Sequence, residues 1–122
     1  MCHPTSYWVP KHSSRVFTLR VDMVCGVGNN NADKAGPAAT KYHELHRVVT
    51  NLAVLDYDPS SHQLRLASLH PGVTVEQVQE STGFDLVVPD DVPCTRLPTE
   101  VELQLIREVI DPRGLRDREV KP

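Results

Sequence analysis

The 122-residue sequence has few cysteines, few aromatic residues and no long apolar run. Its three cysteines, Cys2, Cys25 and Cys94, are odd in number and widely spaced, so the sequence predicts reduced thiols and no disulfide framework. No stretch approaches the roughly 20 apolar residues that a membrane-spanning helix needs. The segment MCHPTSYWVPKHSS at the start also lacks the apolar run of a signal peptide. We therefore expect a cytoplasmic protein with no membrane partner.

Positive charge is not concentrated anywhere along the chain. The formal net charge is -3, with 13 Lys and Arg residues against 16 Asp and Glu residues. The first half has a small positive balance, but it lacks the dense Lys/Arg run with interleaved aromatic residues that binding to a phosphate backbone requires. The sequence therefore predicts no nucleic-acid binding.

Alternating apolar residues and β-branched runs predict several short strands, separated by prolines and glycines. We expect strands at 16–24, 47–57, 63–69 and 85–88. The second and third of these should form an antiparallel hairpin around Pro59. Residues 25–39 combine glycines, asparagines and a proline, so they are expected to form a loop.

Two capping boxes predict two helices. Thr74 and Gln77 begin a helix at about 74–82, which Gly83 should end in a left-handed conformation. Thr99 and Glu102 begin a second helix at about 100–110, whose apolar stripe needs a groove to lie in. Helices that follow two groups of strands indicate an α/β fold with a sheet layer.

The spacing of histidines and cysteines does not favour a metal site. Zinc ligands usually occur in close pairs such as CxxC or HxxxH, and neither pattern is present. His43 and His46 are three residues apart and could share one face of a helix, but no further ligand stands at a zinc-like spacing. The sequence predicts no metal.

A glycine-containing loop is the best candidate for ligand contact. Gly26, Val27, Gly28 and Asn29 follow a predicted strand, where backbone N–H groups can meet an anion or an oxyanion. The spacing is neither that of a dinucleotide-binding loop nor that of a P-loop. The alternatives are that Cys25 is a nucleophile, or that the loop needs glycine only for its dihedral angles.

No pattern of catalytic groups is self-sufficient. Ser68 and His70 are close in sequence, but there is no nucleophile elbow, so His70 is expected to take part in a turn from strand to helix. The carboxylate pairs Asp56–Asp58 and Asp90–Asp91 lie beside prolines, which favours exposed turns over acid/base catalysis. We predict no catalytic residue in this chain.

Three segments resemble one enzyme family. HRVVTNLAVLDY and LRLASLHPGVTVEQVQESTGFDLVV are similar to the closing part of the beta subunit of heteromeric CoA-transferases of the 3-oxoacid and glutaconate type. WVPKHSSRVFTLRVDMVCGVGN is similar to the family's strand with a Lys/Arg-His pair and its following glycine-containing loop. The resemblance spans about residues 7–115, with Asn51 standing where an acidic residue is common. The segment DLVVPDDVPCTRLPTEVELQLIREVIDPRGL is similar to the tail of the glutaconate-like branch that includes steroid-ring-degrading enzymes.

The resemblance implies a partial NagB/RpiA/CoA-transferase-like α/β fold. Residues 1–89 would be the C-terminal part of the beta-type domain, and 90–122 a proline-rich connection, a docking helix and a charged tail. The intact beta-type protein would act with an alpha-type subunit, as a hetero-oligomer, on acyl-CoA thioesters and carboxylates. The catalytic glutamate would be absent here, so the chain alone is expected to be inactive. Coenzyme A thioester would be a substrate, with no cofactor bound permanently.

Two other functions stay open from the sequence. One is a subunit of a hydrolase that opens a ring of a CoA thioester in steroid catabolism, with its glutamate on the alpha-type partner. The other is a noncatalytic assembly module, which should expose an apolar face.

Overall fold

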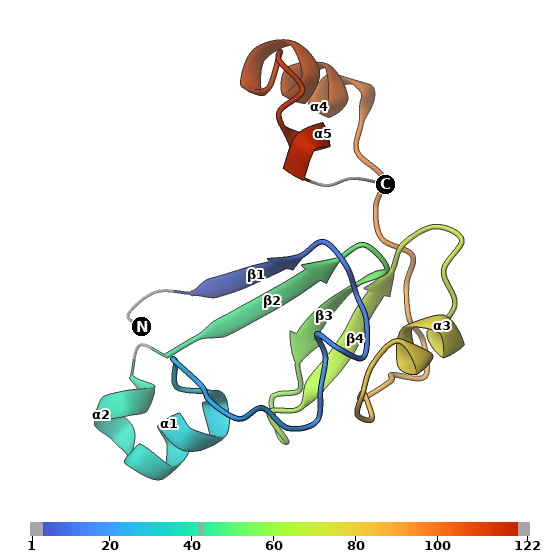
Figure 1. Cartoon of the computed structure of the whole chain (residues 1–122). Helices are drawn as coiled ribbons and strands as arrows, with labels where there is room; N and C mark the ends of the chain where they lie inside the picture. Colours follow the sequence, from blue (N-terminus) through green and yellow to red (C-terminus); the bar gives the residue numbers. More distant parts are fainter. Residues whose placement is uncertain (1–3, 42, 120–122) are drawn as a thin grey trace.

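The fold is built on a four-stranded mixed sheet. The computed structural model describes residues 4–41 and 43–119. The strands are β1 (Thr5–Val9), β2 (Leu45–Thr50), β3 (Ala53–Tyr57) and β4 (Leu64–Leu69), and they lie in this order across the sheet (Figure 1). β1 is parallel to β2, whereas β2, β3 and β4 form an antiparallel meander.

Short helices flank the sheet. They are α1 (Asn29–Ala35), α2 (Pro37–Thr40), α3 (Val75–Glu80), α4 (Glu100–Gln104) with its π-helical continuation η1 (Leu105–Ile110), and α5 (Arg116–Glu119). Figure 1 shows α1 and α2 at one end of the sheet, α3 beside β4, and α4 and α5 apart from the strands. Within the described residues, no helix has the length and apolar character to cross a membrane. This arrangement confirms the predicted α/β class.

The core lies on one face of the meander. Val48, Leu55 and Leu66 are neighbours across β2, β3 and β4, and each is at most 5% exposed. Val78 from α3 is fully buried in the same cluster, which also includes Phe17. The core therefore joins elements from the first fifth of the chain to elements of its centre.

The predicted strand 47–57 is wrong as a single element, because the chain reverses direction between Thr50 and Ala53. The Thr50 hydroxyl oxygen accepts hydrogen bonds from the backbone N–H groups of Leu52 and Ala53, each at 3.1 Å. These bonds stabilise a tight turn, so the β-branched run becomes two paired strands. Continuous β propensity does not show where a strand folds back.

The predicted strand 16–24 is also wrong. Phe17 is buried, but Leu19 is 79% and Met23 is 87% exposed, so the alternating residues do not cover a common core. The Val16 and Phe17 N–H groups bond to the Ser13 carbonyl oxygen and form a turn. The N-terminal strand is instead β1, a five-residue segment between two prolines whose polar and apolar residues do not alternate, so the sequence pattern does not predict it.

The predicted loop 25–39 contains two helices. α1 begins after Gly28, whose carbonyl oxygen accepts bonds from the N–H groups of Asn31 and Ala32, and Ala32 is 1% exposed. Gly36, with φ 91°, separates α1 from α2. Burial of Ala32 outweighs the weak helix propensity of three consecutive asparagines.

The predicted strand 63–69 is confirmed as β4, and its hairpin with β3 turns around Pro59. The Asp58 carboxylate accepts bonds from the backbone N–H groups and hydroxyls of Ser60 and Ser61, which close the turn. The expected strand 85–88 is reduced to one bridge, in which Val87 exchanges backbone bonds with β4.

Both capping boxes form as predicted, although the predicted end of the first helix is wrong. Gly83 does not adopt a positive φ. It is a close-approach site, because a Cβ at this position would stand 2.7 Å from the Phe17 carbonyl oxygen. Its N–H group donates to that same oxygen. The second helix begins at Thr99, but no groove in the described residues covers its apolar stripe: Val101 is 74% exposed.

Candidate functional site: a hollow beside the first helix

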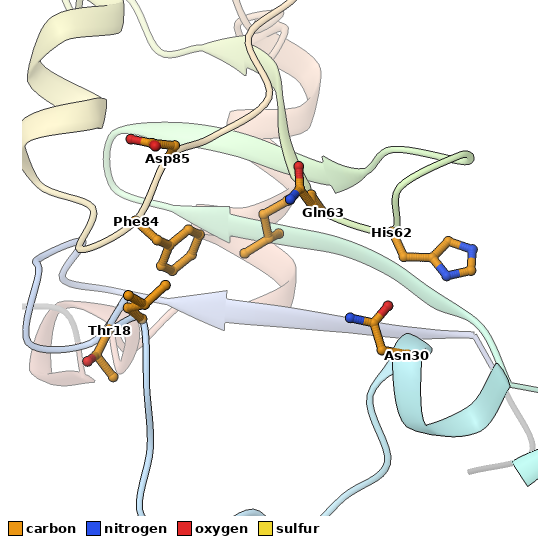
Figure 2. Close-up of a pocket in the computed structure, with 8 residues that line it drawn as sticks. Thr18, Asn30, His62, Gln63, Phe84 and Asp85 are labelled. Carbon is orange, nitrogen blue, oxygen red and sulfur yellow. The ribbon is translucent and has the colours of Figure 1, made fainter. Parts of the chain in front are cut away.

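Two adjoining hollows lie between α1, the β3–β4 turn and the segment that follows Phe17. The larger, about 630 Å³, is lined by Leu19, Val24, Gly26, Gly28, Asn29, Asn30, Asn31, Lys34, Leu45, Tyr57 and His62. The smaller, about 490 Å³, shares Leu19, Asn30 and His62 with it. Figure 2 shows this second hollow, with Asn30 from α1 and His62 from the turn on one side and Thr18 and Phe84 on the other.

Three of the four residues predicted to contact a ligand line the larger hollow. Gly26, Gly28 and Asn29 lie at its wall, whereas Val27 is 51% exposed and is not a lining residue. A Cβ at either glycine would meet no atom within 4 Å. Close packing therefore does not explain why glycine occupies these two positions.

A close contact between His62 and Asp33 fixes one border of the hollow. His62 Nδ1 lies 2.8 Å from the Asp33 carboxylate, so the β3–β4 turn is tied to α1. His62 has φ 56°, and its N–H donates to the Asp58 carbonyl oxygen at 2.8 Å. The turn conformation thus directs the imidazole towards α1. Sequence spacing does not predict that His62 and the Gly26–Asn29 segment border the same hollow.

The residues that line the hollow suit the binding of a ligand. Asparagine amides, Lys34 and exposed backbone supply hydrogen-bond donors, while Leu19, Val24 and Leu45 supply an apolar wall. Such a combination suits a ligand with an apolar body and a carbonyl or carboxylate group. Cys25 is exposed and does not line the hollow, so the geometry does not support it as a nucleophile there.

Ser68 and His70 come together, but not as a nucleophile and its base. His70 Nε2 donates to the Thr50 carbonyl oxygen at 2.8 Å, and in the neutral ring Nδ1 is then the acceptor of the Thr95 hydroxyl at 3.0 Å. Ser68 therefore donates its proton to Thr95, at 2.7 Å. The chain of bonds holds the segment around Thr95 against the sheet and leaves Ser68 without an activating base.

The sequence patterns did not point to the buried histidine His12. His12 is 6% exposed, and its ring nitrogens lie 3.1 Å from the Thr50 hydroxyl and 2.9 Å from the Thr82 hydroxyl. The ring also stacks on Phe17. Burial lowers the pKa of His12, so the neutral ring is favoured. The partners lie 38 and 70 residues away, and no local pattern reports such contacts.

The carboxylate pair Asp56–Asp58 is engaged in structural bonds. Asp56 receives two bonds from the Arg65 guanidinium, at 2.9 and 2.7 Å. The hydroxyl and backbone bonds from Ser60 and Ser61 lower the pKa of Asp58. Both carboxylates are therefore engaged in structural bonds, Asp56 with Arg65 and Asp58 with the turn.

The expectation that His43 and His46 could share a helix face is wrong, because His46 lies in β2. Across residues 4–41 and 43–119, no group of three or more His, Cys, Asp or Glu side chains has the arrangement to hold a metal ion. The hollow beside α1 thus stays the main candidate site.

Comparison with known proteins identifies relatives over almost the whole chain. No protein-family model matches the sequence. The Rhodococcus jostii protein named "Cholesterol ring-cleaving hydrolase IpdB subunit" is 56% identical over 118 residues, which are 97% of this chain and 46% of that protein. The Mycobacterium tuberculosis protein of the same name is 48% identical over 98% of this chain and 47% of its own length. The B subunit of glutaconate CoA-transferase from Acidaminococcus fermentans is 32% identical over 84% of this chain and 39% of its own length.

Solved structures agree with these relatives. A chain of Rhodococcus jostii IpdAB superposes on 98% of this chain and 48% of its own length, with a TM-score of 0.84 and 53% identity. Glutaconate coenzyme A-transferase from Acidaminococcus fermentans superposes on 90% of this chain and 42% of its own, with a TM-score of 0.77 and 27% identity. The chain thus spans about half the length of the curated relatives it matches, and it belongs to the family of CoA-transferase-like B subunits.

Proposed function

We propose that this chain is part of the B-type subunit of a heteromeric, CoA-transferase-like hydrolase that opens a ring in steroid catabolism. One observation carries the proposal: identity is 56% to a B subunit named as a cholesterol ring-cleaving hydrolase, against 32% to the B subunit of glutaconate CoA-transferase. The hydrolase branch is therefore favoured over the transferase branch within one fold.

The proposed contribution of the chain is a wall of the ligand cleft. Gly26, Gly28 and Asn29 would offer backbone and amide donors to a carbonyl or carboxylate, and the apolar side of the hollow would face a hydrocarbon ring. Val27 belongs to the same predicted loop and would support its conformation from the exposed side. The catalytic group would come from outside this chain, because the Ser68–His70 and Asp56–Asp58 pairs are committed to structural bonds.

The proposal also includes a partner, a substrate class and a location. An alpha-type subunit would complete a hetero-oligomer, and a coenzyme A thioester would be the substrate with no permanently bound cofactor. Residues 1–89 would form the subunit's sheet region, and 90–122 a connection, docking helix and tail. The complex would work in the cytoplasm on a small-molecule substrate.

A chimeric enzyme tests this function. The segment of Rhodococcus jostii IpdB that matches this chain would be replaced by residues 1–122 and produced with its partner subunit. We expect water to open the ring of a CoA thioester that carries a cyclic ketone, without any acceptor acid. Asn29→Ala in the chimera should raise KM more than it lowers kcat, because the residue is assigned to binding. A folded chimeric complex that carries out only CoA exchange would contradict the hydrolase assignment.

The second candidate function is CoA transfer between an acyl-CoA and a carboxylate. It is favoured by the glutaconate enzyme's structural match, with a TM-score of 0.77. Adding a dicarboxylate acceptor to the same chimeric complex would distinguish the two reactions. A transferase moves CoA from the acyl-CoA donor to the acceptor and releases the donor acid, whereas a hydrolase forms no CoA ester of the acceptor. Purified chain without a partner should show neither reaction, and if the chain is a noncatalytic assembly module, Asn29→Ala should leave both KM and kcat of the chimera unchanged.

A further inference from the structure

The two hollows beside α1 share a floor on the core face of the sheet. Tyr57, at the end of β3, lines the larger hollow, and Leu64, at the start of β4, lines the smaller one. These two residues are direct partners across the strands, and each lies two positions from a buried residue, Leu55 or Leu66. Side chains two positions apart in a strand point to the same face. The hollows therefore adjoin each other at the point where the packed core ends.

Tyr57 has its ring in the core and a hydroxyl without a partner. The ring packs against the buried cluster that includes Leu55 and Leu66. In residues 4–41 and 43–119, no group forms a hydrogen bond with the Tyr57 hydroxyl, and only His43 Nε2 is a buried side-chain atom without a partner. The Tyr57 oxygen is thus accessible as well as unpaired. A phenol that is held by its ring in this way offers a fixed hydrogen-bond donor.

The surroundings keep this hydroxyl protonated. Burial, and then the neighbouring Tyr7, raise the pKa of Tyr57 above its ordinary value of 10.0. The group is therefore a neutral donor throughout the physiological range of pH. A neutral donor suits a ketone oxygen, whereas a carboxylate would gain more from the Lys34 ammonium group in the same hollow.

The other polar groups of the larger hollow come from a different side. Asn30, Asn31 and Lys34 belong to α1, and His62 Nδ1 is engaged with Asp33. Among the described lining residues, Tyr57 is the one that brings a side-chain donor from a strand.

Apolar side chains surround this donor. Leu19, Val24 and Leu45 line the larger hollow with Tyr57, and Phe84 lines the smaller one beside Leu64 (Figure 2). Apolar walls with one placed donor are typical of a site for a hydrocarbon ring that carries a carbonyl group.

We propose that Tyr57 is a specificity-determining residue of this site, and that its hydroxyl donates a hydrogen bond to the ring carbonyl oxygen of a substrate with a cyclic ketone. This inference rests on the proposed function, which supplies the class of substrate. The α1 amides and Lys34 would then meet the more polar groups of the same molecule. A ring without the carbonyl would leave the Tyr57 donor unpaired against an apolar surface, which disfavours its binding.

Binding of two matched acids tests the inference. One probe is a fused two-ring acid with a ring ketone, and the other is the same acid with CH₂ in place of the carbonyl. Both are free acids, so binding is measured apart from turnover of a CoA thioester. Calorimetry gives the dissociation constants for the full chain and for the chimeric complex described above.

Tyr57→Phe removes only the hydroxyl. It should weaken binding of the keto acid by about fivefold or more, and it should leave binding of the CH₂ acid unchanged, because only the ketone accepts the bond. Tyr7→Phe is the matched control: it makes the same change in a neighbouring ring that lines neither hollow, and both dissociation constants should stay as in the parent protein.

Four results would overturn the proposal. They are equal weakening of both acids in Tyr57→Phe, unchanged binding of the keto acid in that variant, an equally large loss in Tyr7→Phe, and no binding of the keto acid to either the chain or the complex. Thermal unfolding supplies a readout for a structural role. Because the hydroxyl bonds no described residue, Tyr57→Phe should keep the parent's unfolding midpoint.

These outcomes are separate from the test of function. Ring opening by the chimera, together with unchanged keto-acid binding in Tyr57→Phe, would keep the proposed reaction and reject the role of Tyr57. Ketone binding that depends on Tyr57, in a complex that only transfers CoA, would do the reverse.

Discussion

Helices α3 and α4 begin with the same motif but have different surroundings. In α3 the Thr74 hydroxyl accepts the Gln77 N–H at 3.3 Å, and the Gln77 side chain accepts the Thr74 N–H at 3.0 Å. In α4 Thr99 and Glu102 make the equivalent pair of bonds, at 3.3 and 2.7 Å. Yet Val78 of α3 is 0% exposed, whereas Val101 of α4 is 74% exposed.

The difference teaches that a cap determines where a helix starts and not whether it is packed. α3 is held along its whole length: Val78 enters the core, and the Gln79 side chain bonds the backbone of Phe84 and Leu86. α4 has its cap and the bonds between Arg96 and Glu102, but its apolar residues meet no core. We therefore expect α3 to unfold with the sheet and α4 to open on its own.

The largest contrast should come from shortening one valine in each helix. Val78→Ala removes buried methyl groups and leaves a cavity, so the free energy of unfolding should fall by roughly 2–3 kcal/mol. Val101→Ala should change it by less than about 0.5 kcal/mol, because the side chain is already in water. Urea denaturation of both variants measures the difference. Equal losses would show that the two helices belong to one cooperative unit.

The end of α3 provides the next contrast. Gly83→Ala should destabilise the fold by about 1–3 kcal/mol, because the new methyl group meets the Phe17 carbonyl oxygen, a backbone atom that cannot move independently. Gly26→Ala is the control, since its Cβ enters open space and should leave stability unchanged or slightly raised. Thermal unfolding of these two variants and the parent protein measures the difference in stability. A stable Gly83→Ala protein would refute the close-approach interpretation.

Removing one cap from each helix should separate local from global stability. Thr74→Ala should lower the free energy of unfolding by about 1 kcal/mol, because α3 is coupled to the core. Thr99→Ala should instead accelerate hydrogen exchange in residues 100–110 while the global unfolding free energy stays nearly constant. The comparison fails if both variants shift the global transition by the same amount.

A pH dependence near neutrality should accompany α3, because His12 bonds Thr82 just after α3. Burial lowers the pKa of His12 below 6.5, so the unfolded chain binds more protons between the folded pKa and 6.5. The His12 contribution to stability is therefore complete above about pH 6.5 and declines as the pH falls towards the folded value. Urea titrations at several pH values should show this slope in the parent protein and in His46→Gln, and lose it in His12→Gln.

The features that sequence predicted well are those encoded by neighbouring residues. The bonds of both capping boxes join positions three residues apart, and the turn around Pro59 is closed by Asp58 and the two serines that follow it. These contacts depend on local geometry alone, so residue type and spacing were sufficient. The resemblance to CoA-transferase beta subunits added the family, which the comparisons confirm.

The features that sequence missed depend on distant partners. Gly83 appeared to be a helix stop, but the reason for glycine there is Phe17, far away in the chain. Thr50 turns the chain between β2 and β3 and also meets His12, which a run of β-branched residues cannot show. For the candidate site, the sequence pointed to Gly26–Asn29, three of whose residues line the hollow, whereas the border at His62 and Asp33 required the tertiary structure. Whether this loop binds a ligand stays a prediction.

The pairing of β1 with β2 has a consequence for the order in which the protein folds. β2, β3 and β4 are joined by short turns, so the meander can form with little loss of chain entropy. β1 must close the whole segment between Val9 and Leu45 before its first ladder bond forms. Contacts of such high sequence separation slow folding, so we expect β1 to join a meander that already exists and to leave it first.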